Sequence, residues 1–463
     1  MSSSLLRTKP LTLVREETSD ERHGLKRALG PWDLVAIGIG CIIGVGIFVR
    51  PGVQAAEHAG PGIILSFAIA ATACACSAMC YAELAAMIPV AGSAYTYGYA
   101  TLGELPAWII GWDLILEYMV AAVLVSTGWS AYLVNLLHHS GIDLPQAVCA
   151  SPWDKQPGLF NLPAVVIVVL LTALLVRGIK ESSRVNFSIV LVKLVVILFF
   201  IALAGPHVDS KNWTPFMPFG FSGVMTAAAI VFLAYVGFDA VSTAAEEARN
   251  PQRDMPIGIM GSLAVATVLY IVVAAIMTGV VPYSHLGVAD PVALVLNELG
   301  MRWPSAIISI GAIAGITSVL LVLLLGQPRI LFAMSRDGLL PPVLAKVHPR
   351  FKTPYVTTIA TGAIVSLAAA FTPLDVSSAL CSIGTLFAFL IVCAGVIALR
   401  YTRPEIHRPF RVRLFPFLPA AGIVLCAYLM VSLPRTAWER FIIWLAVGLV
   451  IYALYGFRRS RLA

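Results

Sequence analysis

Charged residues are scarce in this sequence. Asp, Glu, Lys and Arg make up 12% of its 463 residues, whereas a soluble globular protein carries about 25%. Hydrophobic residues make up 59%, and the mean hydropathy is +0.89. So little charge excludes an ordinary water-soluble protein and favours a chain that crosses a bilayer many times as helices. The short alternating segments of a transmembrane barrel are also lacking.

Catalytic and metal-binding motifs are lacking as well. The sequence contains no H-E-x-x-H, no G-x-S-x-G and no Cys/His cluster with metal-ligand spacing. Seven of the eight cysteines fall in apolar runs, and only Cys149 lies in a loop, which argues against a disulfide framework. We therefore expect no enzyme, no metal and no cofactor. An integral membrane enzyme and a transporter-like sensor are the alternatives from other classes.

Long apolar runs take the place of these motifs. A helix of about 20 residues crosses the roughly 30 Å hydrocarbon core of a bilayer. The runs predict an all-α, polytopic membrane protein with twelve transmembrane helices, at 32–50, 62–88, 104–136, 161–177, 184–204, 223–245, 256–281, 303–334, 354–371, 376–399, 415–433 and 438–457.

The placement of Lys and Arg predicts the topology. With the N-terminus inside, 24 of the 31 basic residues fall in cytoplasmic segments, six fall outside and Lys193 lies within a span. This asymmetry follows the positive-inside rule. We expect a multi-pass protein of the inner or plasma membrane, with a cytoplasmic tail at 1–31 and a cytoplasmic C-terminus at 458–463. The net charge of +7 then reflects topology, so we expect lipids as neighbours and no nucleic-acid partner.

Four glycines stand close together in the first span. The stretch "IGIGCIIGVGIF" at 37–48 contains Gly38, Gly40, Gly44 and Gly46. One interpretation is close helix packing, because small residues four apart let membrane helices approach. The other is a break at 44–46, because each interior glycine weakens a helix by about 1 kcal/mol relative to alanine. Both interpretations can hold together.

A second interruption is predicted in the sixth span. The stretch "FLAYVGFDA" at 232–240 places Gly237 and Asp239 in its middle. Transporters built from inverted repeats carry broken helices at corresponding places in their two halves, with substrate held between them. We expect repeats at 32–204 and 223–399, with two further helices at 415–457. The freed N–H and C=O groups would suit the carboxylate and the ammonium of an α-amino acid.

Five blocks of sequence carry a family resemblance. They are "GVGIFV" at 44–49, "CYAELAAMIPVAGSAYTYGY" at 80–99, "GWDLILEY" at 111–118, "VGFDAVSTAAEEARNPQRDMPIGI" at 236–259 and "GQPRILFAMSRDGLLP" at 326–341. With these blocks the chain resembles the amino acid–polyamine–organocation superfamily, and most of all its cationic amino acid transporter branch, which includes bacterial members. The resemblance implies a LeuT-type fold of five plus five helices in inverted repeat, with helices one and six discontinuous and two extra C-terminal helices.

The resemblance also implies which groups hold the substrate. At the break beside Gly44, the backbone N–H groups of Val45 and Gly46 would meet the carboxylate. The ammonium would meet backbone carbonyls of the two interrupted helices, namely those of Ile42, Leu233, Ala234 and Val236.

Lys193 is the basic residue that the topology leaves inside a span. It follows Arg184 by nine residues, about 14 Å along a helix, which places it near mid-membrane. A lysine at the rim of a span would reach the interface, and a buried one could be a structural cation. In similar transporters a lysine at this place occupies what would be a sodium site between spans one, five and eight. We therefore favour coupling to protons through Lys193, with sodium less favoured.

Other charges in or near the spans have two interpretations each. Glu117 and Asp239 are either hydrogen-bond acceptors within the helix bundle or functional carboxylates. We assign Glu117 to proton coupling and Asp239 to the substrate site. A further group could form an inner gate: Glu246, Glu247, Arg249, Arg253, Arg329, Arg336 and Asp337.

The expected function is import of L-amino acids with protons by alternating access. The eighth span, "GITSVLLVLLLGQ" at 315–327, contains no acid that could pair with a cationic side chain. We therefore favour small or branched neutral amino acids as substrates. A transporter of arginine and lysine and an amino acid exchanger remain the alternatives within this class.

Overall fold

The structure is a computed structural model that describes residues 7, 28–48, 50–90, 93–139, 141–154, 157–288, 290–372, 374–431, 433 and 435–460. Most of the predicted tail at 1–31 and the last three residues of the predicted C-terminal segment therefore lie outside the described residues. Of the described residues, 79% are helical and none forms a strand. One isolated bridge joins Leu29 to Ala248.

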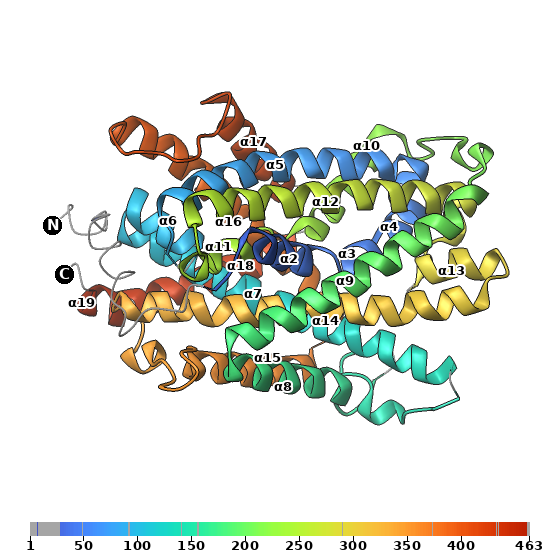
Figure 1. The fold of residues 1–463 in the computed structure, drawn as a ribbon, viewed down its shortest axis with the longest axis horizontal. Helices are drawn as coiled ribbons and strands as arrows, with labels where there is room; N and C mark the ends of the chain where they lie inside the picture. The colour runs from blue at the N-terminus through green and yellow to red at the C-terminus, as the bar shows by residue number, and fades with distance from the viewer. Residues whose placement is uncertain are drawn as a thin grey trace.

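The helices lie mostly side by side along the long axis of the molecule (Figure 1). We call its two ends the α6 end and the α13 end, after the short helices there. The α-helices are α2 (Pro31–Ile42), α3 (Val45–Phe48), α4 (Arg50–Gln54), α5 (Ile63–Met87), α6 (Ala94–Thr101), α7 (Glu104–His139), α8 (Leu162–Arg177), α9 (Ile179–Ala204), α10 (Gly220–Val231), α11 (Ala240–Thr243), α12 (Pro251–Val280), α13 (Pro291–Glu298), α14 (Arg302–Arg336), α15 (Tyr355–Phe371), α16 (Leu374–Thr402), α17 (Phe417–Val431), α18 (Arg435–Ile451) and α19 (Phe457–Arg459).

Within the described residues, eight helical segments are long and apolar enough to cross a membrane. They are Arg50–Met87, Glu104–Val134, Arg184–His207, Gly220–Thr243, Pro251–Val280, Trp303–Arg336, Cys381–Thr402 and Arg435–Arg459. Four shorter apolar helices, α2, α8, α15 and α17, overlap the other four predicted spans, at 32–50, 161–177, 354–371 and 415–433. The total of twelve spans stays a prediction.

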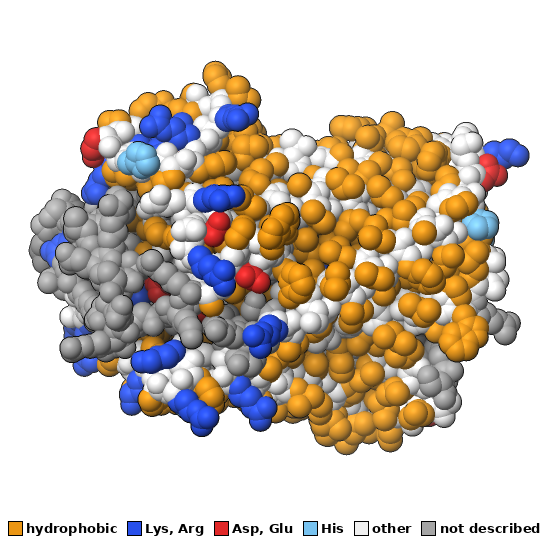
Figure 2. All heavy atoms as spheres, in the orientation of Figure 1, with side chains coloured by type: hydrophobic (Ala, Val, Ile, Leu, Met, Phe, Trp, Pro, Cys, Tyr) orange, Lys and Arg blue, Asp and Glu red, His pale blue; other side chains and the backbone are white. Residues whose placement is uncertain are grey.

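The outer surface carries a broad band of apolar side chains. Figure 2 shows this band over the middle of the molecule, with most Lys and Arg side chains of this face gathered near the α6 end. On α9 the band includes Leu191, Val195 and Leu198, each more than half exposed. Exposed apolar patches of this extent do not occur on soluble monomers.

Helix α2 lies in the centre of the bundle. Every residue from Leu34 to Ile42 is buried, and the helix packs against α9, α12 and α14. The glycines of the first span allow this, since a Cβ on any of them would overlap a neighbouring side chain. The neighbours are Ser262 for Gly38, Asn186 for Gly40, Val319 for Gly44 and Ala234 for Gly46. The packing interpretation of these glycines is therefore confirmed.

Two short helices were not predicted. Helix α6 falls in the connection expected between the second and third spans, and α13 in the one between the seventh and eighth. Each has only eight residues, which is too few for a transmembrane run. Helix α6 is nonetheless buried against α7 and α16, and it carries the buried side chains Tyr95, Tyr97 and Tyr99.

Helices α17 and α18, the last two long helices, pack against different parts of the bundle. Helix α17 packs against α16 and α5, whereas α18 packs against α7 and α16. The indoles of Trp112 on α7 and Trp444 on α18 stack with centroids 4.6 Å apart. Each indole N–H also donates to the other residue's carbonyl, at 2.8 and 2.9 Å. These reciprocal bonds fix the register of α18 against α7.

A buried carboxylate joins distant segments at one end of the bundle. Glu83 lies near the end of α5 and is 1% exposed. Arg400 Nε of α16 donates to Glu83 Oε1 at 3.0 Å. The Val412 N–H donates to Glu83 Oε2 at 2.6 Å, and Arg408 Nε lies 3.5 Å from Glu83 Oε1. One carboxylate thus ties α5, α16 and the segment before α17 together.

Replacing Glu83 by alanine is expected to destabilise the fold. The substitution removes the acceptor of Arg400 Nε and of the Val412 N–H and leaves the Arg408 guanidinium without its counter-ion, and breaking a buried ion pair on one side costs about 3 kcal/mol or more. The midpoint of thermal unfolding in detergent should fall by several degrees. The control is Glu439→Ala, which removes the exposed partner of Arg435 and should lower stability by less than about 1 kcal/mol. Equal midpoints for both variants would contradict this role of Glu83.

Candidate functional site

The first span is interrupted close to the predicted place. Helix α2 ends at Ile42, and Ile43 has the extended values φ −83° and ψ 102°. Gly44 also lies outside the helices, and α3 begins at Val45. The predicted break at 44–46 is therefore centred slightly too late, because Val45 and Gly46 already belong to α3. The Ile39 carbonyl still accepts from the Ile43 N–H at 3.0 Å, whereas the carbonyls that follow it have no further helical turn to bond.

The sixth span is interrupted over a longer stretch. Helix α10 ends at Val231, and a 3-10 turn spans Phe232–Tyr235. Gly237 has φ +126°, a conformation that a side chain would strain. A Cβ there would also lie 2.7 Å from Cys41 Sγ of α2. Helix α11 begins at Ala240. The contact between Gly237 and Cys41 places the second break directly against the end of α2, next to the first break.

A tyrosine on α12 bridges the two breaks. The Tyr270 hydroxyl lies 2.6 Å from the Ile42 carbonyl and 2.8 Å from the Ala234 carbonyl. Both carbonyls belong to the set that the resemblance implies for the substrate ammonium. Sequence reasoning missed Tyr270, because a tyrosine within an apolar span gives no signal that separates it from a packing residue.

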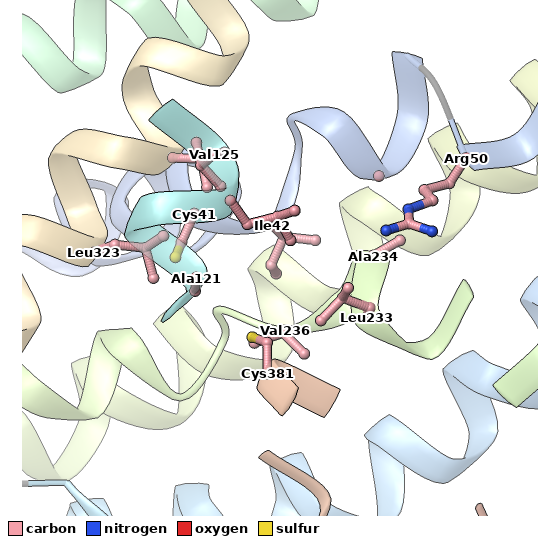
Figure 3. A pocket seen from close by; sticks show the side chains of 13 residues that line it. Cys41, Ile42, Arg50, Ala121, Val125, Leu233, Ala234, Val236, Leu323 and Cys381 are labelled. Carbon is pink, nitrogen blue, oxygen red and sulfur yellow. The ribbon is translucent and has the colours of Figure 1, made fainter. Parts of the chain in front are cut away.

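A pocket lies between the two breaks. It holds about 570 Å³ of empty space, part of it open to solvent. Figure 3 shows Arg50 at one end and Leu323 and Cys41 toward the other. The described residues that line it are Cys41, Ile42, Gly46, Arg50, Ala121, Leu124, Val125, Leu233, Ala234, Val236, Val319, Leu323 and Cys381. Among them only Arg50 is charged.

Five of the eight predicted substrate-binding residues line this pocket, namely Ile42, Gly46, Leu233, Ala234 and Val236. Gly44 and Asp239 are not among the described lining residues, and the side chain of Val45 lies outside what the structure describes. Gly44 is buried against Val319. The pocket walls from α7, α14 and α16 were not predicted, because they consist of ordinary apolar side chains.

Asp239 lies directly behind the second break. Its Oδ2 accepts from the Tyr118 hydroxyl at 2.9 Å, and its Oδ1 accepts from the Gly237 N–H at 3.1 Å. Asp239 is 1% exposed. In this conformation its carboxylate therefore holds the backbone of the break in place and attaches it to α7.

Lys193 is bonded to the end of α2. Its side chain is fully buried, and Nζ lies 2.9, 3.0 and 2.7 Å from the carbonyls of Ile39, Gly40 and Ile43. Nζ also lies 2.7 Å from Ser318 Oγ on α14. The expected place between spans one, five and eight is confirmed, whereas the coupling role stays a prediction. Escape of the ammonium to an interface is excluded by this burial.

Ser318 completes the lysine site and was missed from the sequence. Its hydroxyl lies 2.9 Å from the Gly40 carbonyl and 2.8 Å from the Gly315 carbonyl. The oxygen can therefore accept from Lys193 while its proton goes to a carbonyl. Four oxygens surround an ammonium that has three N–H donors, so the site is well matched to a positive charge.

Two carboxyl groups of α7 lie together near α16. Glu117 Oε1 accepts from the Thr385 hydroxyl at 2.7 Å. Glu117 Oε2 and both oxygens of Asp113 are buried without a hydrogen-bond partner. Asp113 lies one turn before Glu117, and a Cβ on Gly384 would lie 2.8 Å from Asp113 Oδ1.

Ion pairs close the bundle near the α6 end. Arg329 Nη2 donates to Glu247 Oε1 at 2.7 Å, with both side chains at most 4% exposed. Arg336 Nη2 donates to Glu246 Oε1 at 2.9 Å. Burial raises the pKa of the Glu247 carboxyl above its ordinary value, and the Arg329 guanidinium opposes that shift.

The remaining members of the predicted gate group, Asp337, Arg249 and Arg253, do not belong to these two ion pairs. Asp337 Oδ2 accepts from the Tyr95 hydroxyl of α6 at 2.7 Å. Arg249 and Arg253 are exposed, although the Arg249 N–H donates to the Leu29 carbonyl at 2.9 Å. Glu246 and Glu247, which follow α11, thus pair with Arg336 and Arg329 of α14. The sequence could not predict which of these residues pair.

Comparison with known proteins gives the class of this chain. The model of the amino acid permease family matches residues 29–454. The branched-chain amino acid permease BcaP of Bacillus subtilis is 51% identical over 465 residues, covering 100% of both chains. The methylthioribose transporter of Bacillus subtilis is 49% identical over 460 residues, covering 99% of both.

More distant relatives include eukaryotic proteins. The vacuolar cationic amino acid transporter 4 of Arabidopsis thaliana is 38% identical over 410 residues, covering 87% of this chain and 68% of its own. The relatives are named as transporters, not enzymes, and the matched region includes both interrupted helices and the pocket between them. The chain therefore belongs to the amino acid permease family of the amino acid–polyamine–organocation superfamily and is a multi-pass membrane transport protein.

Proposed function

We propose that this protein is a proton-coupled importer of neutral L-amino acids with branched or other apolar side chains. The observation that carries the proposal is the pocket between the two interrupted helices, whose described lining side chains other than Arg50 are uncharged and mostly apolar. The BcaP relative supports the same substrate class through its name and its 51% identity.

The pocket suits an apolar side chain for a physical reason. Ala121, Leu124 and Val125 of α7 line it together with Val319 and Leu323 of α14. Burying an apolar side chain gains about 25 cal/mol per Å², so a leucine-sized side chain gains affinity here. A cationic side chain would lose hydration with no acid among the described lining residues, which argues against arginine and lysine as substrates.

The backbone of the substrate would be held at the breaks. The Ile42 and Ala234 carbonyls lie close enough to share one hydroxyl, that of Tyr270. An ammonium group placed among these carbonyls would find several acceptors at once. The carboxylate would meet the N–H groups at the start of α3, where Val45 and Gly46 lie.

Coupling to protons would pass through Lys193. In its charged form the lysine binds three carbonyls of the first span together with α14. Loss of the proton removes the charge and one donor, which weakens the attachment of this helix end to α9 and α14. Such a change would let the proton state bias the position of α2, while Glu117 would exchange a second proton. A cation already fills this place, so sodium is the less favoured ion.

The topology is proposed from the same features. Eight long and four shorter apolar helices coincide with the twelve predicted spans, and the interruptions fall in the first and sixth, as a LeuT-type inverted repeat requires. Basic side chains gather near the α6 end (Figure 2). By the positive-inside rule this end faces the cytoplasm. The buried pairs Arg329–Glu247 and Arg336–Glu246 would then be the closed inner gate.

A second candidate substrate is methylthioribose. The relative named for it is nearly as similar as BcaP over the full length, and an apolar pocket accepts a thioether as readily as a branched alkyl group. This sugar has no ammonium, so it would leave the carbonyls of the two breaks to Tyr270. Uptake of methylthioribose without uptake of leucine would favour this candidate.

Uptake by proteoliposomes tests the proposed substrate and coupling. With an inward proton gradient, labelled leucine, isoleucine and valine should accumulate, whereas lysine and arginine should not. Imposing a sodium gradient alone should have no effect. The measurement is accumulated label against time, with a protonophore as control. Accumulation of lysine in preference to leucine would show that the proposed substrate class is wrong.

Replacing Lys193 by alanine tests the coupling role. The variant should lose accumulation driven by pH, because no proton-binding group remains at the end of α2. Exchange of internal for external leucine should persist, since Lys193 is not among the described residues that line the pocket. The matched control is Lys211→Ala, which removes an exposed lysine. Proton-driven accumulation at the wild-type level in the Lys193 variant would rule out this coupling role.

A further inference from the structure

The Tyr270 hydroxyl lies against two acceptors. Its oxygen is 2.6 Å from the Ile42 carbonyl oxygen and 2.8 Å from the Ala234 carbonyl oxygen, and both distances are within the range of a hydrogen bond. A tyrosine hydroxyl has one proton, and a carbonyl has none to donate. One of the two contacts is therefore a full hydrogen bond, whereas at the other contact two oxygens meet without a proton between them.

Aromatic packing fixes the position of this hydroxyl. Tyr270 is fully buried on α12, and its ring centroid lies 5.3 Å from that of Phe67 and 5.2 Å from that of Tyr235. These two neighbours are themselves bonded, because the Tyr235 hydroxyl donates to the Phe67 carbonyl at 3.1 Å. A buried ring packed in this way has few other rotamers. The three oxygens are therefore held together by the surrounding structure.

Three oxygens that share one proton form an electronegative site. Ile42 and Ala234 line the pocket (Figure 3), and each lies where a helix is interrupted. A carbonyl oxygen has two lone pairs, so each can accept a second hydrogen bond while the Tyr270 hydroxyl stays in place. An ammonium group brings three N–H donors and a positive charge, which offsets the repulsion between the oxygens. A hydroxyl group of a solute brings one donor and no charge.

We propose that Tyr270 is a positioning residue for the substrate ammonium: its hydroxyl holds the Ile42 and Ala234 carbonyls together as one pair of acceptors, and this pair selects α-amino acids over α-hydroxy acids. The inference rests on amino acid transport as the proposed function and deepens it. Tyr270 acts through the two carbonyls, since it is not among the described residues that line the pocket. Without its hydroxyl the carbonyls lose their common link, and an ammonium loses more affinity than a group with a single donor.

The test compares Tyr270→Phe with Tyr235→Phe, its matched control. Each substitution removes one buried hydroxyl from the same aromatic cluster, but only the first removes a contact with the two carbonyls. In proteoliposomes, unlabelled leucine and its α-hydroxy analogue, leucic acid, compete with labelled leucine. The ratio of the inhibition constant of leucic acid to that of leucine should fall by about tenfold in Tyr270→Phe, because hydrogen bonds from a charged group are the ones weakened. Tyr235→Phe should keep the wild-type ratio.

A second measurement keeps the test decisive where Tyr270→Phe transports no leucine. Thermal stabilisation of the purified variants by leucine and by leucic acid reports binding without transport, and the same fall in the ratio is expected. An unchanged ratio in Tyr270→Phe, an equal loss of both ligands, or the same fall in Tyr235→Phe would overturn the positioning role. Absence of leucine uptake and of leucine binding in the wild-type protein would instead refute the proposed function, so the two failures are distinguishable.

Discussion

The bonds between Lys193 and the end of α2 are the interaction on which the centre of this molecule depends. An ammonium deep in an apolar bundle must be surrounded by acceptors. A helix end supplies them more readily than a helix interior, where each carbonyl already accepts from the N–H group four residues later. Helix α2 ends at Ile42, and Lys193 binds the carbonyls of Ile39, Gly40 and Ile43 around this end. The buried charge and the end of the helix therefore stabilise one another.

The same break also shapes the pocket on the other side of the helix. Tyr270 joins the Ile42 carbonyl to the Ala234 carbonyl, so the two interrupted spans meet at one hydroxyl. Gly237 approaches Cys41 closely behind them. A shift of α2 caused by the state of Lys193 would thus be felt at the Ile42 carbonyl, one residue away from the carbonyl of Ile43 that the lysine binds. This short path would give the proposed ion and substrate sites a common moving part.

Features that depend on local sequence were predictable, and features that depend on pairing were not. The glycines predicted both the close packing of α2 and its interruption, since either consequence follows from the absence of a side chain. The depth of Lys193 followed from its distance to Arg184. Tyr270 and Ser318 gave no such signal, because tyrosine and serine occur throughout buried helices as packing residues. The centre of the first break was placed late for a related reason: Gly46 is needed for contact with Ala234, not for flexibility.

The pairs Arg329–Glu247 and Arg336–Glu246 illustrate why buried charges suit a gate. The cost of removing both charges from water nearly cancels their attraction, so a buried ion pair adds little net stability. An apolar seal of the same size would hold the closed state more strongly. In the proposed cycle the closed inner gate is therefore favoured only slightly, and the free energy available from binding one small solute is enough to shift its equilibrium. Partial burial of Arg336, at 13% exposure against 4% for Arg329, makes the outer of the two pairs the easier one for water to reach and the first to separate.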